Sequence, residues 1–118
     1  MKTGKEIKAA MKKLGVKCGL MKLDDGYEIY IGQGAIIDHT ARIGADVVIG
    51  NYSAIGAHTK IGNHVNIGND AYIGGNVVIK TNADIEDGVI ISDRAYIGRG
   101  VKLGAYSIVD TPDIINLD

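Results

Sequence analysis

The chain contains no phenylalanine and no tryptophan, and it has one cysteine and one proline among its 118 residues. An ordinary globular core uses large aromatic rings, so their scarcity predicts an interior that is narrow and aliphatic. The single cysteine, Cys18, excludes an internal disulfide and a thiolate metal cluster, and it fits a reducing compartment. We therefore expect a cytoplasmic protein.

An excess of charge of one sign is also missing, as are long apolar runs. The 13 basic and 14 acidic residues nearly cancel, so no overall field would recruit nucleic acid or an anionic membrane. No window approaches the roughly 20 apolar residues of a membrane span, and the first residues lack the apolar core of a signal peptide. We expect one soluble domain, in which any ligand is held by a local site.

A repeat of six residues dominates the chain. An aliphatic residue, which we number position one, recurs at every sixth position from Ile31 to Leu103, thirteen times without exception. Position five is always small or β-branched, and position two is glycine nine times. We expect this glycine to relieve a tight turn, and the asparagines that often follow it to tolerate left-handed backbone geometry. The residues that replace glycine at position two are Asp38, Lys80, Glu86 and Ser92.

A period of six fits neither a continuous helix nor one long strand. It fits short strands joined by turns, in which positions five and one point inward and position six points outward. Three such strands make a triangular coil, and successive coils stack about 4.8 Å apart. The spacing therefore predicts a parallel β-helix of about four triangular coils over residues 31–108, with every position-one side chain buried.

Runs such as Ile-Gly-Asn-Tyr-Ser-Ala (49–54) and Ile-Gly-Asn-His-Val-Asn (61–66) carry a family resemblance. They resemble the hexapeptide-repeat proteins of the left-handed parallel β-helix fold, a family rich in acyltransferases, and the resemblance covers about two-thirds of the chain. It implies an all-β, single-stranded, left-handed coil that packs as parallel trimers. The hand comes from the resemblance alone, because parallel crossovers are normally right-handed.

The two ends depart from the repeat. Residues 1–30 predict an amphipathic helix over 3–14, with a Thr3–Glu6 capping box, and a hairpin turning at Asp25-Gly26 that pairs onto the first coil. The helix would cover the open end of the coils, although its lysines also leave a basic binding arm as an alternative. Residues 109–118, in which Pro112 breaks the pattern, predict a capping tail.

The outward position-six residues form three columns, read every 18 residues. One is apolar throughout, and such a face marks a contact surface, so we expect the chain to associate with itself through it, as the homotrimer that the resemblance implies. This column consists of Ile36, Ala54, Tyr72, Ile90 and Ile108. The second column is Arg42, Lys60, Val78 and Tyr96, and the third is Tyr30, Val48, Asn66, Asp84 and Lys102.

Candidate chemistry lies beside the apolar column. His39 and His58 fall on the edge that follows it, and Arg42 stacks beside Lys60 on the next column. Asp93 and Arg94 share the histidine edge. The resemblance implies that a cleft histidine acts as general base and that acetyl-CoA, the donor, lies between subunits. His58 and His39 are thus the catalytic candidates, and Arg42, Lys60, Arg94 and Asp93 the candidates for binding an anionic ligand, coenzyme A or a nucleotide.

Other readings stay open. The histidines, His64 included, also suit solvated turns. A three-histidine zinc site, as in the γ-class carbonic anhydrases of the same fold, needs a His-x4-His pair, whereas His58 and His64 are six apart on different edges, so no metal is expected. No hexad is interrupted by the long active-site loop usual in the acyltransferases. This favours a non-catalytic protein that binds or sequesters a ligand, and a trimeric structural module is the third alternative.

Overall fold

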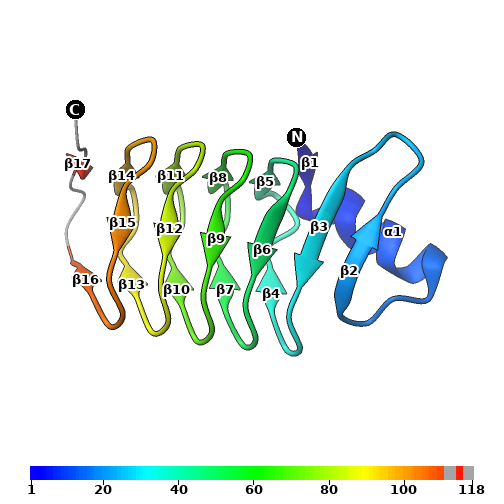
Figure 1. Cartoon of the computed structure of the whole chain (residues 1–118), viewed down its shortest axis with the longest axis horizontal. Helices are drawn as coiled ribbons and strands as arrows, with labels where there is room; N and C mark the ends of the chain where they lie inside the picture. The colour runs from blue at the N-terminus through cyan, green and yellow to red at the C-terminus, as the bar shows by residue number, and fades with distance from the viewer. Residues whose placement is uncertain (111–113, 116–118) are drawn as a thin grey trace.

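The computed structural model describes residues 1–110 and 114–115, which form a stack of β-coils capped at the N-terminal end by a helix and a hairpin (Figure 1). The chain begins with β1 (Lys2–Thr3), α1 (Gly4–Leu14), β2 (Gly19–Lys22) and β3 (Glu28–Ile31). The fourteen strands that follow have two or three residues each and are distributed over three sheets. α1 is the one helix in the described part of the chain, and it lacks the length and apolar character that crossing a membrane requires.

Each sheet forms one side of the stack. The β4 sheet holds β4 (Ile36–Ile37), β7 (Ala54–Ile55), β10 (Tyr72–Ile73), β13 (Ile90–Ile91) and β16 (Ile108–Val109). The β5 sheet holds β1, β5 (Arg42–Ile43), β8 (Lys60–Ile61), β11 (Val78–Ile79), β14 (Tyr96–Ile97) and β17 (Ile114–Ile115). The β6 sheet holds β2, β3, β6 (Val47–Ile49), β9 (Asn66–Ile67), β12 (Asp84–Ile85) and β15 (Lys102–Leu103).

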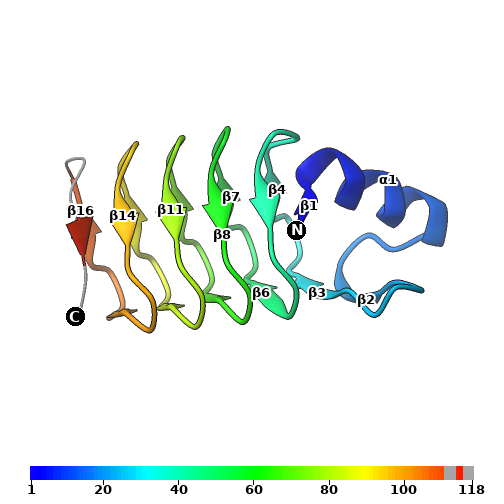
Figure 2. The same ribbon diagram turned by 90° about the horizontal axis from the view of Figure 1, so that it is seen from above.

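The predicted parallel β-helix is confirmed. Strands 18 residues apart pair in parallel, as Arg42 with Lys60 and Tyr72 with Ile90, and Figure 2 shows the coils one behind another along the long axis. The number of coils is five rather than four. Val109 and Ile115 continue position one, and β17 pairs with β14 through Ile114 opposite Tyr96. The predicted tail thus contributes Val109 to β16 and the whole of β17, while residues 111–113 and 116–118, Pro112 included, lie outside the described residues.

The core is the aliphatic stack that the repeat predicts. Every position-one side chain from Ile31 to Ile97 is buried, and Leu103, near the C-terminal end of the stack, is half-buried. Two polar residues, Ser53 and Thr59, are also buried at position five. Each hydroxyl forms two hydrogen bonds with the backbone of the next coil. Thr59 Oγ1 donates one to Gly74 O at 2.7 Å and accepts one from Val77 N at 3.2 Å. The core therefore buries these hydroxyl groups without leaving them unpaired.

The turns differ from the expectation at two positions. Left-handed backbone occurs at position four, where nine non-glycine residues have positive φ, and not at the position-two glycines or at the position-three asparagines Asn51, Asn63 and Asn69. The glycine is needed for space, because a Cβ on Gly62 would lie 2.6 Å from Thr81 N in the next coil. The asparagines instead bond between coils: Asn51 Oδ1 accepts Gln33 N, and Asn69 Oδ1 accepts Asn51 N, both at 2.8 Å.

The N-terminal cap confirms the predicted helix and hairpin. Thr3 and Glu6 form the capping box, and Gly15 ends the helix with φ 69°. The first amides of α1 are bonded to the first coil, Gly4 N to Ala41 O at 2.8 Å and Lys5 N to His39 O at 3.0 Å. Strand β2 pairs with β3, which pairs in turn with β6. The helix therefore covers the open end of the coils, as the first of the two readings expects.

Candidate functional site

The apolar column lies on the outer surface of the β4 sheet and remains exposed along its whole length. Ile36 is 66% exposed, Tyr72 54%, Ile90 42% and Ile108 64%, and Ala54 between them is partly exposed. Their strands pair directly, so the side chains form one continuous strip. Water contact with a strip of this size is unfavourable. The strip therefore has the character of a contact surface that another molecule would bury.

The edge between the β4 and β5 sheets, which we call the histidine edge, consists of the turns 38–41, 56–59, 74–77 and 92–95. His39 and His58 lie on its first two turns, and both side chains are exposed. The two turns are linked by Thr40, whose Oγ1 accepts His58 N at 2.9 Å. His58 has φ 58°, a conformation that histidine tolerates better than most residues. Its ring is thus presented on the surface by a left-handed turn.

Asp38 organises the first turn of this edge. Its Oδ1 accepts the Thr40 hydroxyl at 2.6 Å and the Thr40 amide at 2.9 Å, and these bonds hold the pKa of the Asp38 carboxyl below its ordinary value. His39 Nδ1 lies 3.7 Å from the same oxygen. Asp38 therefore places a carboxylate near the His39 ring, and no acidic side chain has an equivalent place beside His58 among the described residues.

The cations predicted to bind an anion lie on the adjoining β5 sheet. Arg42 and Lys60 face outward opposite each other on β5 and β8, and both are exposed. Within residues 1–110 and 114–115, neither takes part in an ion pair. Two stacked positive charges without acidic partners repel each other, although solvent weakens the effect.

Asp93 and Arg94 lie on the fourth turn of the histidine edge, two coils beyond His58. Asp93 Oδ1 accepts Gly75 N at 2.9 Å, so its carboxylate supports the turn below it. Arg94 is exposed and occupies the left-handed position with φ 67°. His64 lies on the other edge of the β5 sheet, with Nδ1 3.6 Å from Asp46 Oδ2. The structure therefore separates His64 from the histidine edge.

Two depressions contain predicted site residues, and each adds a side chain that sequence reasoning missed. The first, of about 320 Å³, places His39 and Asp38 beside Ile36 and Tyr72 of the apolar strip, with Lys8 of α1 at its border. The second, of about 160 Å³, places Lys60 beside Lys80 and Thr81. Lys80 carried a signal in the sequence, since it replaces glycine at position two. Lys8 lies outside the six-residue repeat, so the repeat gave no signal that it would lie in the same depression as His39.

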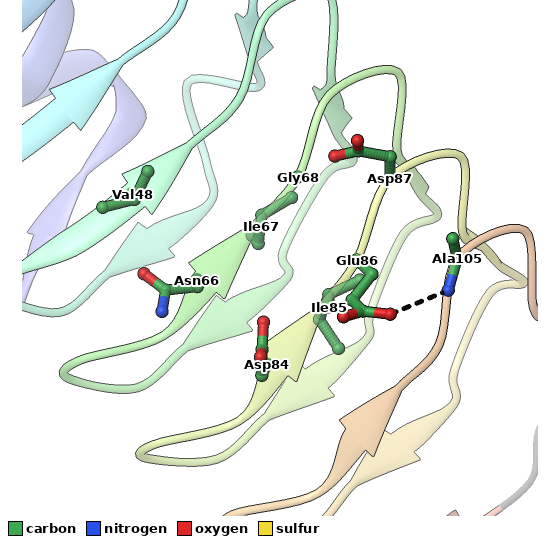
Figure 3. Close-up of a pocket in the computed structure, with 9 residues that line it drawn as sticks. All are labelled: Val48, Asn66, Ile67, Gly68, Asp84, Ile85, Glu86, Asp87 and Ala105. Carbon is green, nitrogen blue, oxygen red and sulfur yellow. Dashed lines mark hydrogen bonds between the residues drawn. The ribbon is translucent and has the colours of Figure 1, made fainter.

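A larger depression of about 420 Å³ lies on the β6 sheet and is acidic (Figure 3). Two of its three carboxylates are engaged in the fold: Glu86 Oε1 accepts a hydrogen bond from Ala105 N at 3.1 Å, and Asp87 Oδ1 accepts one from Asn69 N at 2.8 Å. The other Glu86 oxygen, Oε2, lies 3.5 Å from Lys102 Nζ. In the described part of the chain, no group of three histidine, cysteine, aspartate or glutamate residues is arranged to hold a metal ion.

Comparison with known proteins supports the same fold. Residues 28–63 match the family model described as bacterial transferase hexapeptide (six repeats). No curated protein matches the chain in sequence. Among solved structures, serine acetyltransferase isoform 3 from Entamoeba histolytica, in complex with cysteine, is similar with a TM-score of 0.55 and 22% identity over 72% of this chain. The chain spans about a third of that protein's length, since 35% of it is covered.

Two further structures are similar only at low TM-scores. A candidate acetyltransferase from Bacillus cereus has a TM-score of 0.39 and 21% identity, over 70% of this chain and 69% of that one. Perosamine N-acetyltransferase from Caulobacter crescentus, solved as a mutant in complex with CoA and GDP-perosamine, has a TM-score of 0.31 and 16% identity, over 94% of this chain and 59% of that one. The chain therefore has unbroken coils that form a parallel β-helix with a six-residue repeat, and residues 28–63 of this repeat are similar to the bacterial transferase hexapeptide family.

Proposed function

We propose that this chain forms a homotrimer through its apolar strip and binds an anionic small molecule, coenzyme A or a nucleotide, in the clefts between subunits. The observation that carries the proposal is the position of the strip. It runs along the β4 sheet directly beside the histidine edge, and the stacked cations Arg42 and Lys60 follow on the next sheet. A partner covering the strip would bring its own surface against His39 and His58 and create a cleft there.

Acetyl transfer from acetyl-CoA is the reaction that this cleft would support. His58 or His39 would take a proton from the hydroxyl or amine of the acceptor as that group attacks the thioester carbonyl, and the thiolate of coenzyme A would leave. Asp38 lies 3.7 Å from His39 Nδ1 and could orient this ring in the complex, whereas no carboxylate lies beside His58 among the described residues. The serine acetyltransferase of similar fold supports this reading.

A second function, binding without turnover, is favoured by the regularity of the coils. From Ile31 to Asp110 every turn between strands is short, and no loop leaves the stack to cover the histidine edge. Loops commonly supply lids and catalytic groups. A protein that holds the same anionic ligand in the same clefts would need none.

Calorimetric titration with coenzyme A and with nucleotides tests the proposal. We expect binding that Lys60→Ala weakens by more than tenfold and that added salt weakens as well. Lys22→Ala is the matched control, because Lys22 lies on the hairpin and pairs with Glu28 at 3.3 Å. Absence of binding at millimolar ligand would contradict both functions and leave the structural module.

An assay of acetyl transfer then separates the two functions. If the protein is an enzyme, His58→Ala or His39→Ala abolishes transfer from acetyl-CoA while the affinity for coenzyme A is retained. If wild type binds tightly and transfers nothing to a panel of hydroxyl and amine acceptors, the binding protein is the correct reading.

A further inference from the structure

The depression that contains Lys60 lies on a single chain, away from the apolar strip. It is formed by Met1, Lys60, Gly62, Val78, Ile79, Lys80 and Thr81, where the β5 sheet meets its second edge. Its ionisable side chains are two lysines, both exposed, and no acidic residue borders it. The half-buried Val78, which pairs with Lys60 in the sheet, lies between the two lysines. The hollow is therefore positively charged with an aliphatic floor.

Lys80 owes its place to an exception in the repeat. It occupies position two, where the turns one coil before and one coil after have Gly62 and Gly98. Neither of these two residues has a side chain that would lie beside Lys80. At Gly62 the next coil packs closely, because a Cβ there would lie 2.6 Å from Thr81 N and 3.0 Å from Thr81 Oγ1, and the glycine thus lets Lys80 and Thr81 lie directly beside the turn that follows Lys60. Lys80 therefore places a positive charge at a position that is glycine in the turns of the neighbouring coils.

The three cations Arg42, Lys60 and Lys80 form an oblique row. Arg42 and Lys60 are paired on β5 and β8, and Lys80 follows β11 on the next coil, displaced away from the histidine edge. Among the described residues, none of the three takes part in an ion pair. Adjacent ammonium groups without a counter-charge favour binding of an anion with several charged oxygens, and lysine binds phosphate as a point charge.

We infer that Lys60 and Lys80, with the Thr81 hydroxyl, bind the phosphoanhydride of a diphosphate-containing ligand on one subunit. The inference rests on the proposed function for the identity of the whole ligand, and it adds where the charged part is held. The rest of the ligand would extend across the β5 sheet past Arg42 toward the histidine edge. The phosphate site is then complete in one chain, whereas the reactive end needs the trimer.

Calorimetry with inorganic pyrophosphate tests this location. We expect saturable binding with one site per chain, weakened at least fivefold by Lys80→Ala and unchanged by Lys102→Ala. Lys102 is the matched control because it is an outward lysine of another sheet, 3.5 Å from Glu86. Equal effects of the two substitutions, or no saturable binding at millimolar pyrophosphate, would overturn the inference.

The strip variant Ile90→Lys separates this inference from the proposed function. If the variant is a folded monomer, it should bind pyrophosphate with wild-type affinity, and a loss of binding would show that the site needs two chains. If the Ile90→Lys variant does not fold, the pyrophosphate affinities of Lys80→Ala and Lys102→Ala still show whether Lys80 belongs to the site. Binding of coenzyme A that depends on Lys60 but not on Lys80 would contradict this inference and leave the proposed function standing.

Discussion

At the scale of single residues, Lys60 and Ile61 show how the hexad assigns opposite roles to neighbours. Ile61 is fully buried in the aliphatic stack, while Lys60 beside it faces water. Successive side chains of a strand point to opposite faces, so a buried residue lies next to an exposed one in the strands of all three sheets. Function and stability are therefore separated by one position in the sequence, which allows each to be tested by substitutions that spare the other.

Ile61→Asp should unfold the protein. The change places an unpaired carboxylate in a dry stack that is covered by Ile43 and Ile79 in the coils on either side, at a cost of roughly 3 kcal/mol or more. Circular dichroism with urea denaturation measures the effect. Lys60→Asp, at the exposed outward position beside Ile61 and opposite Arg42, is the control and should retain a midpoint close to that of wild type. A soluble and folded Ile61→Asp variant would count strongly against this interior.

Gly50→Ala should destabilise the fold, whereas Gly104→Ala should not. At Gly50 a Cβ would collide with the backbone of Gly68 and lie 2.6 Å from Asn69 N, so we expect a loss of about 1 to 3 kcal/mol in the free energy of unfolding. At Gly104, the same position of a later hexad, the nearest atom is Glu86 Oε1 at 3.8 Å. Equal midpoints for the two variants in urea would contradict the spatial role of glycine.

The division between inside and outside was predictable from the sequence because it depends only on the period. The roles of the turn residues were not. Glycine at position two can indicate either positive φ or close packing, and the choice depends on the distance to the next coil, as Gly62 shows. Likewise the bond from Gln33 N to Asn51 Oδ1 joins residues 18 apart, so it becomes visible only when the coils are stacked.

At the scale of elements, the first turn of the histidine edge connects the cap to the coils. Its carbonyls accept the first amides of α1, and Asp38 stabilises the turn through Thr40. The helix and hairpin were predictable because capping boxes and Asp-Gly turns are local signals. The pairing of β1 with β5 was not, since a strand of two residues has no periodicity. The last strand of the fifth coil, β17, was missed because Pro112 interrupts the sequence repeat before it.

The carboxyl of Asp38 should titrate at a pKa below that of an ordinary aspartate. The hydroxyl and amide of Thr40 stabilise its charged form, so this turn contributes stability above about pH 4 that is lost as the pH falls through the lowered pKa. Thr40→Val removes the larger contribution and should raise the pKa of Asp38 in an NMR titration. Glu6, whose pKa is lowered by Thr3, should not change. If the pKa of Asp38 in the Thr40→Val variant equals its pKa in the wild-type protein, Thr40 is not the cause of the lowered value.

At the scale of the whole molecule, the outer faces differ in character, and the functional account depends on this difference. The β4 sheet exposes an apolar strip, the β5 sheet exposes the cations Arg42 and Lys60, and the β6 sheet carries an acidic depression. The columns were readable from the sequence, because outward residues recur every 18 positions. The meeting of α1 with the histidine edge, through Lys8 and His39, was not, since it depends on how the cap docks.

Light scattering of the wild-type protein tests the central claim, that the apolar strip joins copies of this chain and thereby forms the binding clefts. The account predicts a particle of about three times the 12.5 kDa chain mass, which Ile90→Lys dissociates or aggregates, while Asn66→Lys on the polar column leaves it intact. A wild-type protein that is monodisperse at a single chain mass would contradict the account.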